Sequence, residues 1–266
     1  ESLRFNNFHV SPVCAPTRSS LLTGRYSLRT GVTDTYNGGA IMSSSEITLA
    51  EIFAEKNYKT GIFGKWHLGD NYPSRPSDQG FQESLIHLAG GIGQVGDFTN
   101  YYAGNVSYYD PALWHNNEIK KYEGYCSDIF TDEALKFIEQ NKSNQFFCYL
   151  SFNAPHTPLQ VPEKYYDLYK DIDPSNFYDE VTYEMTERDV NDAKKIYGMV
   201  TNIDENFGKL LYKLEELDIK ENTIVIFLTD NGPQQTRYVS NLRGLKSEVY
   251  NGCLLYTSDA ADELRS

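Results

Sequence analysis

The stretch Phe146-Phe147-Cys148-Tyr149-Leu150-Ser151-Phe152 is the part of this sequence that best defines its fold. A short, nearly continuous apolar run is typical of a strand that is covered on both faces, as in a parallel sheet. The run follows residues 128–139, in which apolar side chains recur with helical spacing. A helix leading into a buried strand is one unit of an α/β protein.

The same unit occurs twice more along the chain. Thr48 and Glu51 have the spacing of a capping box that opens a helix, and residues 59–65 follow as a strand. A long amphipathic pattern predicts a helix over residues 187–217, and the apolar run at 223–229 predicts a third strand. Helices that alternate with apolar strands predict an α/β protein with a largely parallel sheet.

Composition indicates a globular chain that is acidic overall. The 266 residues are 40% hydrophobic, and the formal net charge is −13. No run of eighteen apolar residues occurs, so we expect no membrane insertion. Nucleic acid and anionic membranes both require a basic surface, and neither is expected as a partner. An anionic substrate would therefore need a local basic pocket.

The two ends of the chain look incomplete. The sequence does not begin with Met and opens inside a strand-like stretch at residues 5–10. Residues 253–266 resemble a translated sequencing-library adapter, and we set them aside as a non-native tail. The four cysteines show neither metal spacing nor a disulfide framework. We therefore expect one incomplete domain over residues 1–252.

Polar residues follow each of the three predicted strands. Lys65 and His67 end the first, His156 follows the second, and Asp230 and Asn231 follow the third. Ligands of open parallel sheets lie beyond the carboxyl ends of the strands, so these side chains are expected at one edge. Taken singly, each could be a solvated charge or a turn residue. Their joint placement favours a binding or catalytic site.

Asp230 and Asn231 offer hard oxygen ligands, which suit calcium or magnesium. Two such residues are too few for a complete site. The glycine-rich stretch at residues 90–96 does not match a phosphate-binding loop between a strand and a helix, and we interpret it as an ordinary loop.

The stretch Cys14-Ala15-Pro16-Thr17-Arg18 predicts the start of a helix. Pro16 suits a first helical turn, and Gly24 suits the position just past the helix end. Cys14 would then lie at a helix N-terminus, where unpaired N–H groups favour anions. Arg18 could reach the same end. The alternative is a buried free cysteine at the start of an ordinary helix.

Five motifs together resemble type I sulfatases, the arylsulfatase branch of the alkaline phosphatase superfamily. They occur in the family's order, at residues 14–25, 64–69, 154–158, 229–233 and 242–246. The resemblance implies an alkaline phosphatase-like α/β fold, with a mostly parallel sheet flanked by helices. It also implies that the first strand and a smaller C-terminal subdomain lie outside this chain.

By this resemblance the protein would be a sulfuric ester hydrolase. Cys14 would be oxidised to formylglycine by a formylglycine-generating enzyme, and the hydrated aldehyde would attack sulfur. Arg18 and Lys65 would stabilise the hydrate and the sulfuryl charge. His67 would act as a base, whereas His156 and Lys246 would bind the ester oxygens and protonate the leaving alcohol.

The resemblance also implies a calcium ion held by Asp230, Asn231 and the modified Cys14. Family members supply two more carboxylates from an aspartate pair in an N-terminal strand, and nothing before Cys14 provides them. We therefore expect this 266-residue chain to bind metal weakly and to be inactive by itself.

A sulfated small molecule or glycan is the implied substrate, and family habit places such enzymes outside the cell, in the periplasm or in the lysosome. Two other functions stay open. One is a phosphoesterase or phosphonate hydrolase of the same superfamily. The other is a binding protein that kept the fold and lost catalysis.

Overall fold

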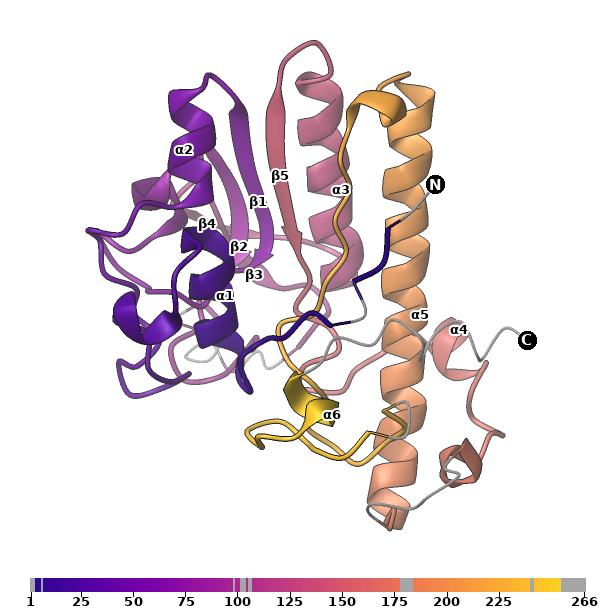
Figure 1. The fold of residues 1–266 in the computed structure, drawn as a ribbon. Helices are drawn as coiled ribbons and strands as arrows, with labels where there is room; N and C mark the ends of the chain where they lie inside the picture. The colour runs from indigo at the N-terminus through magenta and orange to yellow at the C-terminus, as the bar shows by residue number, and fades with distance from the viewer. Residues whose placement is uncertain are drawn as a thin grey trace.

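The computed structural model describes residues 3–5, 7–97, 99–100, 104, 107–177, 184–239 and 242–254. The strands are β1 (Lys59–Lys65), β2 (Glu83–His87), β3 (Ala112–His115), β4 (Glu118–Lys121) and β5 (Phe146–Ser151). The α-helices are α1 (Cys14–Thr23), α2 (Leu49–Glu55), α3 (Cys126–Gln140), α4 (Glu163–Tyr166), α5 (Glu187–Glu216) and α6 (Asn251–Leu254). Figure 1 shows their arrangement.

The sheet has the strand order β4-β3-β2-β1-β5. β1 is parallel to both of its neighbours, β2 and β5, whereas β3 pairs antiparallel with β2 and with β4. The α/β class is therefore confirmed, with a mixed sheet whose parallel ladders are the two that involve β1. Because β1, β2 and β5 run the same way, their carboxyl ends lie at one edge, which positions the site.

Helices cover both faces of the sheet, and alternate residues of β1 point into the two resulting cores. Phe63 packs in the core that includes Phe130 of α3 and Met199 of α5. Ile62 packs in the other core, with Leu22 of α1. Successive side chains of a strand point to opposite faces, so a run of apolar residues suits a strand covered on both sides. In Figure 1, α1 and α2 lie on one side of the sheet, and α3 and α5 lie on the other.

The helices agree closely with the predicted ones. The capping box is present, since Thr48 Oγ1 accepts from the Glu51 N–H at 3.2 Å and Glu51 Oε2 accepts from the Thr48 N–H at 2.8 Å. α5 ends one residue before the predicted helix does. No helix within the described ranges has the length and apolar character needed to cross a membrane.

The prediction of a strand at residues 223–229 is wrong, since the structure assigns no strand to this segment. The segment forms no ladder with a neighbouring strand, and Ile224 and Ile226 are 90% and 75% exposed. An apolar run becomes a strand only where a partner supplies backbone hydrogen bonds, and β5 is the last strand on this side of the sheet. Figure 1 shows the segment descending from the upper end of α5.

Substitution of two phenylalanines tests this division between core and exposed segment. Phe130 is fully buried, and Phe130→Ala should lower the free energy of unfolding by about 3–5 kcal/mol. Phe227 is 54% exposed, and Phe227→Ala should cost less than about 1 kcal/mol. Urea unfolding monitored by circular dichroism measures both. An equal loss in the two variants would mean that the 223–229 segment is packed like a core strand.

Candidate active site

Cys14 is the first residue of α1 and is only 2% exposed. The helix ends at Gly24, whose φ of 66° is left-handed, as expected for a residue just past a helix end. The residue before Cys14 provides no side-chain cap, so the helix N-terminus keeps backbone N–H groups that favour an anion. Lys246 Nζ lies 3.1 Å from Cys14 Sγ. The predicted helix start is confirmed, and a cation lies against the thiol.

Arg18 joins α1 to the sheet edge and to the segment after residue 229. Its Nε donates to Asp230 Oδ2 at 3.0 Å. One terminal nitrogen donates to the Lys65 carbonyl at 2.9 Å and to Ser151 Oγ at 2.6 Å. Lys65 Nζ lies 3.9 Å from the same Asp230 oxygen. These contacts bring residues from four distant stretches of the chain to one place.

The charges in this cluster change the acidity of its members. Burial alone would raise the pKa of Asp230, but the positive charges of Arg18, Lys65 and Lys246 bring it down to about 2. Burial lowers the pKa of Lys65, and the nearby Cys14 and Asp230 oppose that effect. The cluster therefore contains one ionised carboxylate among basic side chains, which gives the acidic protein a local site for an anion.

His67 lies two residues after the end of β1 and is 6% exposed. Its φ of 61° is left-handed, a conformation that is uncommon outside glycine. The Nε2–H donates to the Thr35 carbonyl at 2.9 Å, since a carbonyl only accepts. Burial, followed by the charge of Lys65, lowers the pKa of His67 well below its ordinary value. His67 is thus neutral, and its Nδ1 is free to accept within the described part of the chain.

His156 follows β5 and is held in a similar way. Its Nδ1 donates to the Thr157 carbonyl at 2.9 Å, which leaves Nε2 as the acceptor. Burial, assisted by the charge of Lys65, lowers the pKa of His156 to about 4. Glycines 90 and 91 approach both imidazoles: Gly90 lies against the His67 ring, and Gly91 against His156. The two histidines therefore meet the same loop.

Asp230 and Asn231 can contribute to a metal site. Asn231 Oδ1 is buried and has no hydrogen-bond partner among the described residues, whereas its Nδ2 donates to the Gly232 carbonyl. A buried amide oxygen without a donor is a suitable ligand for a hard cation. No group of three or more His, Cys, Asp or Glu residues that could hold a metal occurs within the ranges described above. The two oxygen donors fit calcium but form only part of its shell.

Two polar residues of the site were missed in the sequence. Ser151 ends β5, and its Oγ accepts from Arg18 and donates to the Lys65 carbonyl. A lone serine at the end of an apolar run was the available signal. His87 ends β2 opposite Lys65 in the parallel register and is fully buried. Neither of its ring nitrogens has a partner in the described part of the molecule.

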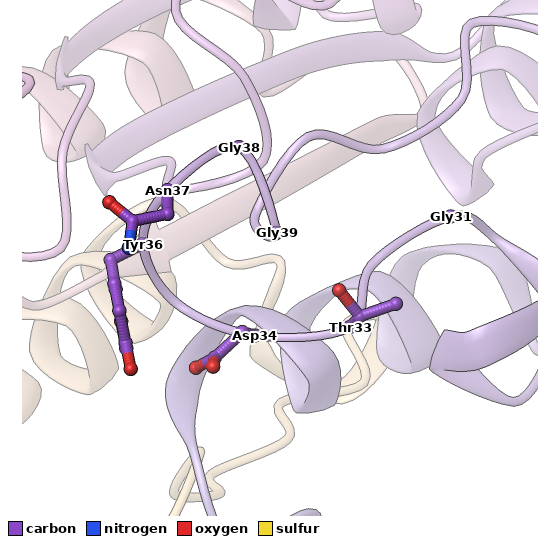
Figure 2. Close-up of a pocket in the computed structure, with 7 residues that line it drawn as sticks. All are labelled: Gly31, Thr33, Asp34, Tyr36, Asn37, Gly38 and Gly39. Carbon is purple, nitrogen blue, oxygen red and sulfur yellow. The ribbon is translucent and has the colours of Figure 1, made fainter.

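A hollow of about 460 Å³ lies in the loop between α1 and α2 and is lined by residues between Gly31 and Gly39. Figure 2 shows the Asp34 and Tyr36 side chains extending toward the same side of this loop. The carbonyl of Thr35, between them, is the group that accepts from His67. One hydrogen bond, from His67 to Thr35, therefore links the site to the loop that forms the hollow.

The fold and this arrangement define an α/β protein with a cluster of basic side chains at a helix N-terminus. Residues 1–254 match the family model described as Sulfatase, and the chain belongs to the sulfatase family. An ulvan-active sulfatase from Formosa agariphila is 31% identical over 87% of this chain and 44% of its own length. Arylsulfatase J of Mus musculus is 27% identical over 95% of this chain and 41% of its own length. The chain spans about half the length of the curated relatives it matches.

Solved structures agree with this assignment of the fold. The structure of Ps i-CgsB in complex with k-i-k-neocarrahexaose is 28% identical, with a TM-score of 0.77 over 94% of this chain and 56% of that one. A phosphonate monoester hydrolase of Agrobacterium radiobacter, at 16% identity and a TM-score of 0.53, shares the fold. The alkaline phosphatase-like architecture expected from the motifs is confirmed.

The adapter-like tail falls largely outside the described residues, which end at 254. Cys253, at its start, is buried, and its Sγ donates to the Pro12 carbonyl at 3.4 Å. The Cys253 carbonyl accepts from the Gly232 N–H at 2.9 Å. The boundary drawn at residue 252 stays a prediction.

Removal of Arg18 should destabilise the fold strongly, because Asp230 would lose a buried hydrogen-bonded partner. We expect Arg18→Ala to lower the free energy of unfolding by about 3 kcal/mol. Arg188→Ala is the control, since Arg188 is 90% exposed in α5 and should change stability by less than about 0.5 kcal/mol. Urea unfolding at neutral pH measures both. A loss at Arg18 no larger than at Arg188 would contradict the proposed anchoring role.

His156 should make the protein sensitive to mild acid. The unfolded chain protonates this ring near pH 6.5 and the folded protein only near pH 4, so protons favour unfolding between these values. The wild type should lose up to about 3 kcal/mol over this window from His156 alone. His156→Gln should reduce the loss, whereas the exposed His9→Gln should not. Urea midpoints at pH 7.5 and pH 5 check this, and identical pH dependence in both variants would contradict it.

Proposed function

We propose that the full-length protein hydrolyses sulfate esters at Cys14. The observation that carries the proposal is the contact of Lys246 Nζ with Cys14 Sγ, at a helix N-terminus beside the cluster of Arg18, Lys65 and Asp230. An anionic ester needs fixed positive groups around the reacting atom, and these are present in a chain that is otherwise acidic. Membership of the sulfatase family supports sulfate as the anion.

We infer that Cys14 is the residue converted to formylglycine by a formylglycine-generating enzyme. The hydrated aldehyde would supply the hydroxyl group that attacks sulfur. The surroundings of Cys14 fit such a group, because Lys246 lies against its side chain and the Arg18 and Lys65 charges lie nearby. Arg18 and Lys65 would hold the negative oxygens of the sulfuryl group in place.

His67 is suited to the role of base. Its Nε2–H is fixed on the Thr35 carbonyl, so the free Nδ1 can accept a proton. The depressed pKa keeps the ring neutral before reaction. Lys246 is better suited than His156 to protonate the leaving alcohol, since His156 is neutral in this structure and its Nε2 can only accept. An anionic ester beside His156 would favour its protonated form.

Calcium is the cation proposed for Asp230 and Asn231, together with the modified Cys14. The ion would polarise a sulfuryl oxygen as a Lewis acid. Asp230 would bind it as an ionised carboxylate, and Asn231 would bind it through the Oδ1 that has no donor among the described residues. Calcium takes six to eight oxygen ligands, so further donors are needed.

A sulfated glycan is the substrate class that we favour over a smaller sulfate ester. The similar structure that holds k-i-k-neocarrahexaose supports a saccharide. The hollow at residues 31–39 is connected to His67, and it contains the exposed ring of Tyr36. An exposed aromatic ring beside polar groups suits the apolar and polar faces of a sugar. The alcohol part of the ester would lie there.

The function is tested in the full-length protein produced together with a formylglycine-generating enzyme. Mass spectrometry of the peptide that contains Cys14 should show replacement of the thiol by an aldehyde. Aryl sulfate and sulfated oligosaccharides should then be hydrolysed, and Cys14→Ala should abolish turnover because the nucleophile is lost. Cys148→Ala, which alters a half-buried cysteine of β5, should retain it.

Matched phosphate and sulfate esters separate the remaining alternatives. Faster turnover of the phosphate or phosphonate ester would identify a phosphoesterase instead. Hydrolysis of neither ester by fully converted protein would favour a binding homologue without catalysis. Equal activity of Cys14→Ala and the wild type would refute the proposed nucleophile.

A further inference from the structure

We propose that Gly90 and Gly91 are positioning residues that fix the imidazoles of His67 and His156 by having no side chain. The proposal rests on the function above, in which His67 is the base and His156 lies beside the anionic ester. The sequence marked residues 90–96 only as a glycine-rich loop, and none of the roles described so far uses these two glycines. Their surroundings give them a specific role.

Gly90 lies directly against the ring of His67. A Cβ atom at Gly90 would be 2.7 Å from Cε1, 3.0 Å from Nε2 and 3.3 Å from Nδ1 of His67. These are the three nearest atoms, and all belong to that imidazole. A methyl group at position 90 would therefore have to displace the ring.

The His67 ring has little freedom to move away. Its Nε2 is hydrogen-bonded to the Thr35 carbonyl, and the residue is held in the left-handed region with a φ of 61°. Displacement would break that hydrogen bond inside the protein, where an unpaired polar group is costly. The position of Nδ1, the proposed proton acceptor, thus depends on Gly90.

Gly91 has the corresponding relation to His156. A Cβ atom there would lie 2.9 Å from His156 Nδ1, the nitrogen that donates to the Thr157 carbonyl. It would also lie 2.8 Å from Cδ of Gln94. Gln94 is half-buried, and its one side-chain hydrogen bond among the described residues is a long one, from Nε2 to Thr157 Oγ1 at 3.4 Å. It can therefore rotate away at less cost than His156, whose bond to the Thr157 carbonyl measures 2.9 Å.

The backbone does not explain these glycines. Neither Gly90 nor Gly91 has a left-handed φ, in contrast to Gly93 and Gly96 of the same loop, at 70° and 93°. Alanine would therefore fit the local conformation at both positions. The steric conflict is with neighbouring side chains, which makes alanine a clean test of the contact.

The loop is also anchored so that it cannot retreat from the rings. Asp97 is fully buried, and its Oδ2 accepts from the Gly93 N–H at 2.7 Å and from Asn100 Nδ2 at 3.0 Å. Its Oδ1 accepts from Thr99 Oγ1 at 2.7 Å. A carboxylate bound by three donors holds the loop in one conformation. Both histidines are thus confined between the loop and their own hydrogen-bond acceptors.

Double-mutant cycles measure these contacts without any assay of activity. Gly90→Ala should lower the urea midpoint of the wild type but should have little further effect in a His67→Ala background, where the obstructing ring is absent. Gly91→Ala should behave in the same way toward His156→Ala. The crossed pairs, Gly90 with His156 and Gly91 with His67, should be additive. The proposal is overturned if each glycine variant lowers the urea midpoint equally with and without its paired histidine ring.

Activity then tests the role of the contacts in the full-length, converted protein. Gly90→Ala and Gly91→Ala should lower kcat by about 100-fold, because a displacement of the order of 1 Å is sufficient for such a loss. KM should change much less, and the pH profile should shift as the rings move. Gly208→Ala is the control and should match the wild type, because the added Cβ in α5 would meet no atom within 4 Å beyond the backbone of its own helix and its two chain neighbours.

The two levels of the proposal fail separately. If the wild type hydrolyses no sulfate ester while the cycles show coupling, the positioning is retained and the sulfatase function is lost. If the wild type is active and the alanine variants keep its kcat and pH profile, the positioning role is wrong. If a glycine variant is too unstable for the activity assay, the double-mutant cycle still tests the contact, since removal of the paired histidine ring should restore the stability of that variant.

Discussion

The guanidinium of Arg18 is the group on which the geometry of the site depends. It binds the Asp230 carboxylate, the Lys65 carbonyl and the Ser151 hydroxyl, so α1, β1, β5 and the segment after residue 229 meet at one side chain. The planar fork of arginine suits several acceptors at once, which lysine could not replace. This matters most for Asp230, because residues 223–229 are not paired into the sheet. The ion pair with Arg18 and a few backbone contacts therefore hold Asp230 near Cys14. The sheet does not hold it.

The electrostatics of the cluster explain how an acidic protein can receive an anion. Asp230 stays ionised because Arg18, Lys65 and Lys246 surround it, and it compensates part of their charge when no ligand is bound. The two histidines stay neutral because they are buried beside these cations. The resting site therefore combines fixed positive charge with neutral proton acceptors, an arrangement suited to bind an anion before any proton moves.

Much of the fold could be predicted because its signals are local. β1 has the expected bounds, and α5 is wrong by a single residue, since long amphipathic periodicity and strand-length apolar runs carry strong information. β2, β3 and β4 were not predicted, because four or five residues give little periodicity. The apolar run at 223–229 has every local feature of a strand. A strand also requires a partner, and no local pattern states whether one is present.

The site residues were likewise predicted only in part. Polar residues at strand ends were expected to converge, and Lys65 and Asp230 lie 3.9 Å apart, with Arg18 of α1 bound to the same carboxylate. Ser151 and the glycine pair were missed because their roles come from contacts between distant segments. Gly90 and Gly91 illustrate the point: their importance comes from a missing atom, and only the position of the neighbouring rings reveals why an atom would not fit.

The exposed segment at residues 224–227 has a practical consequence for handling this chain. An exposed apolar stretch whose backbone groups pair with no strand among the described residues is a template for edge-to-edge pairing with another molecule. Two copies could satisfy each other's amides and carbonyls there and hide Ile224 and Ile226 from water. Raising the concentration of this chain should therefore promote self-association through that stretch, and a lysine at position 226 would make the pairing less favourable.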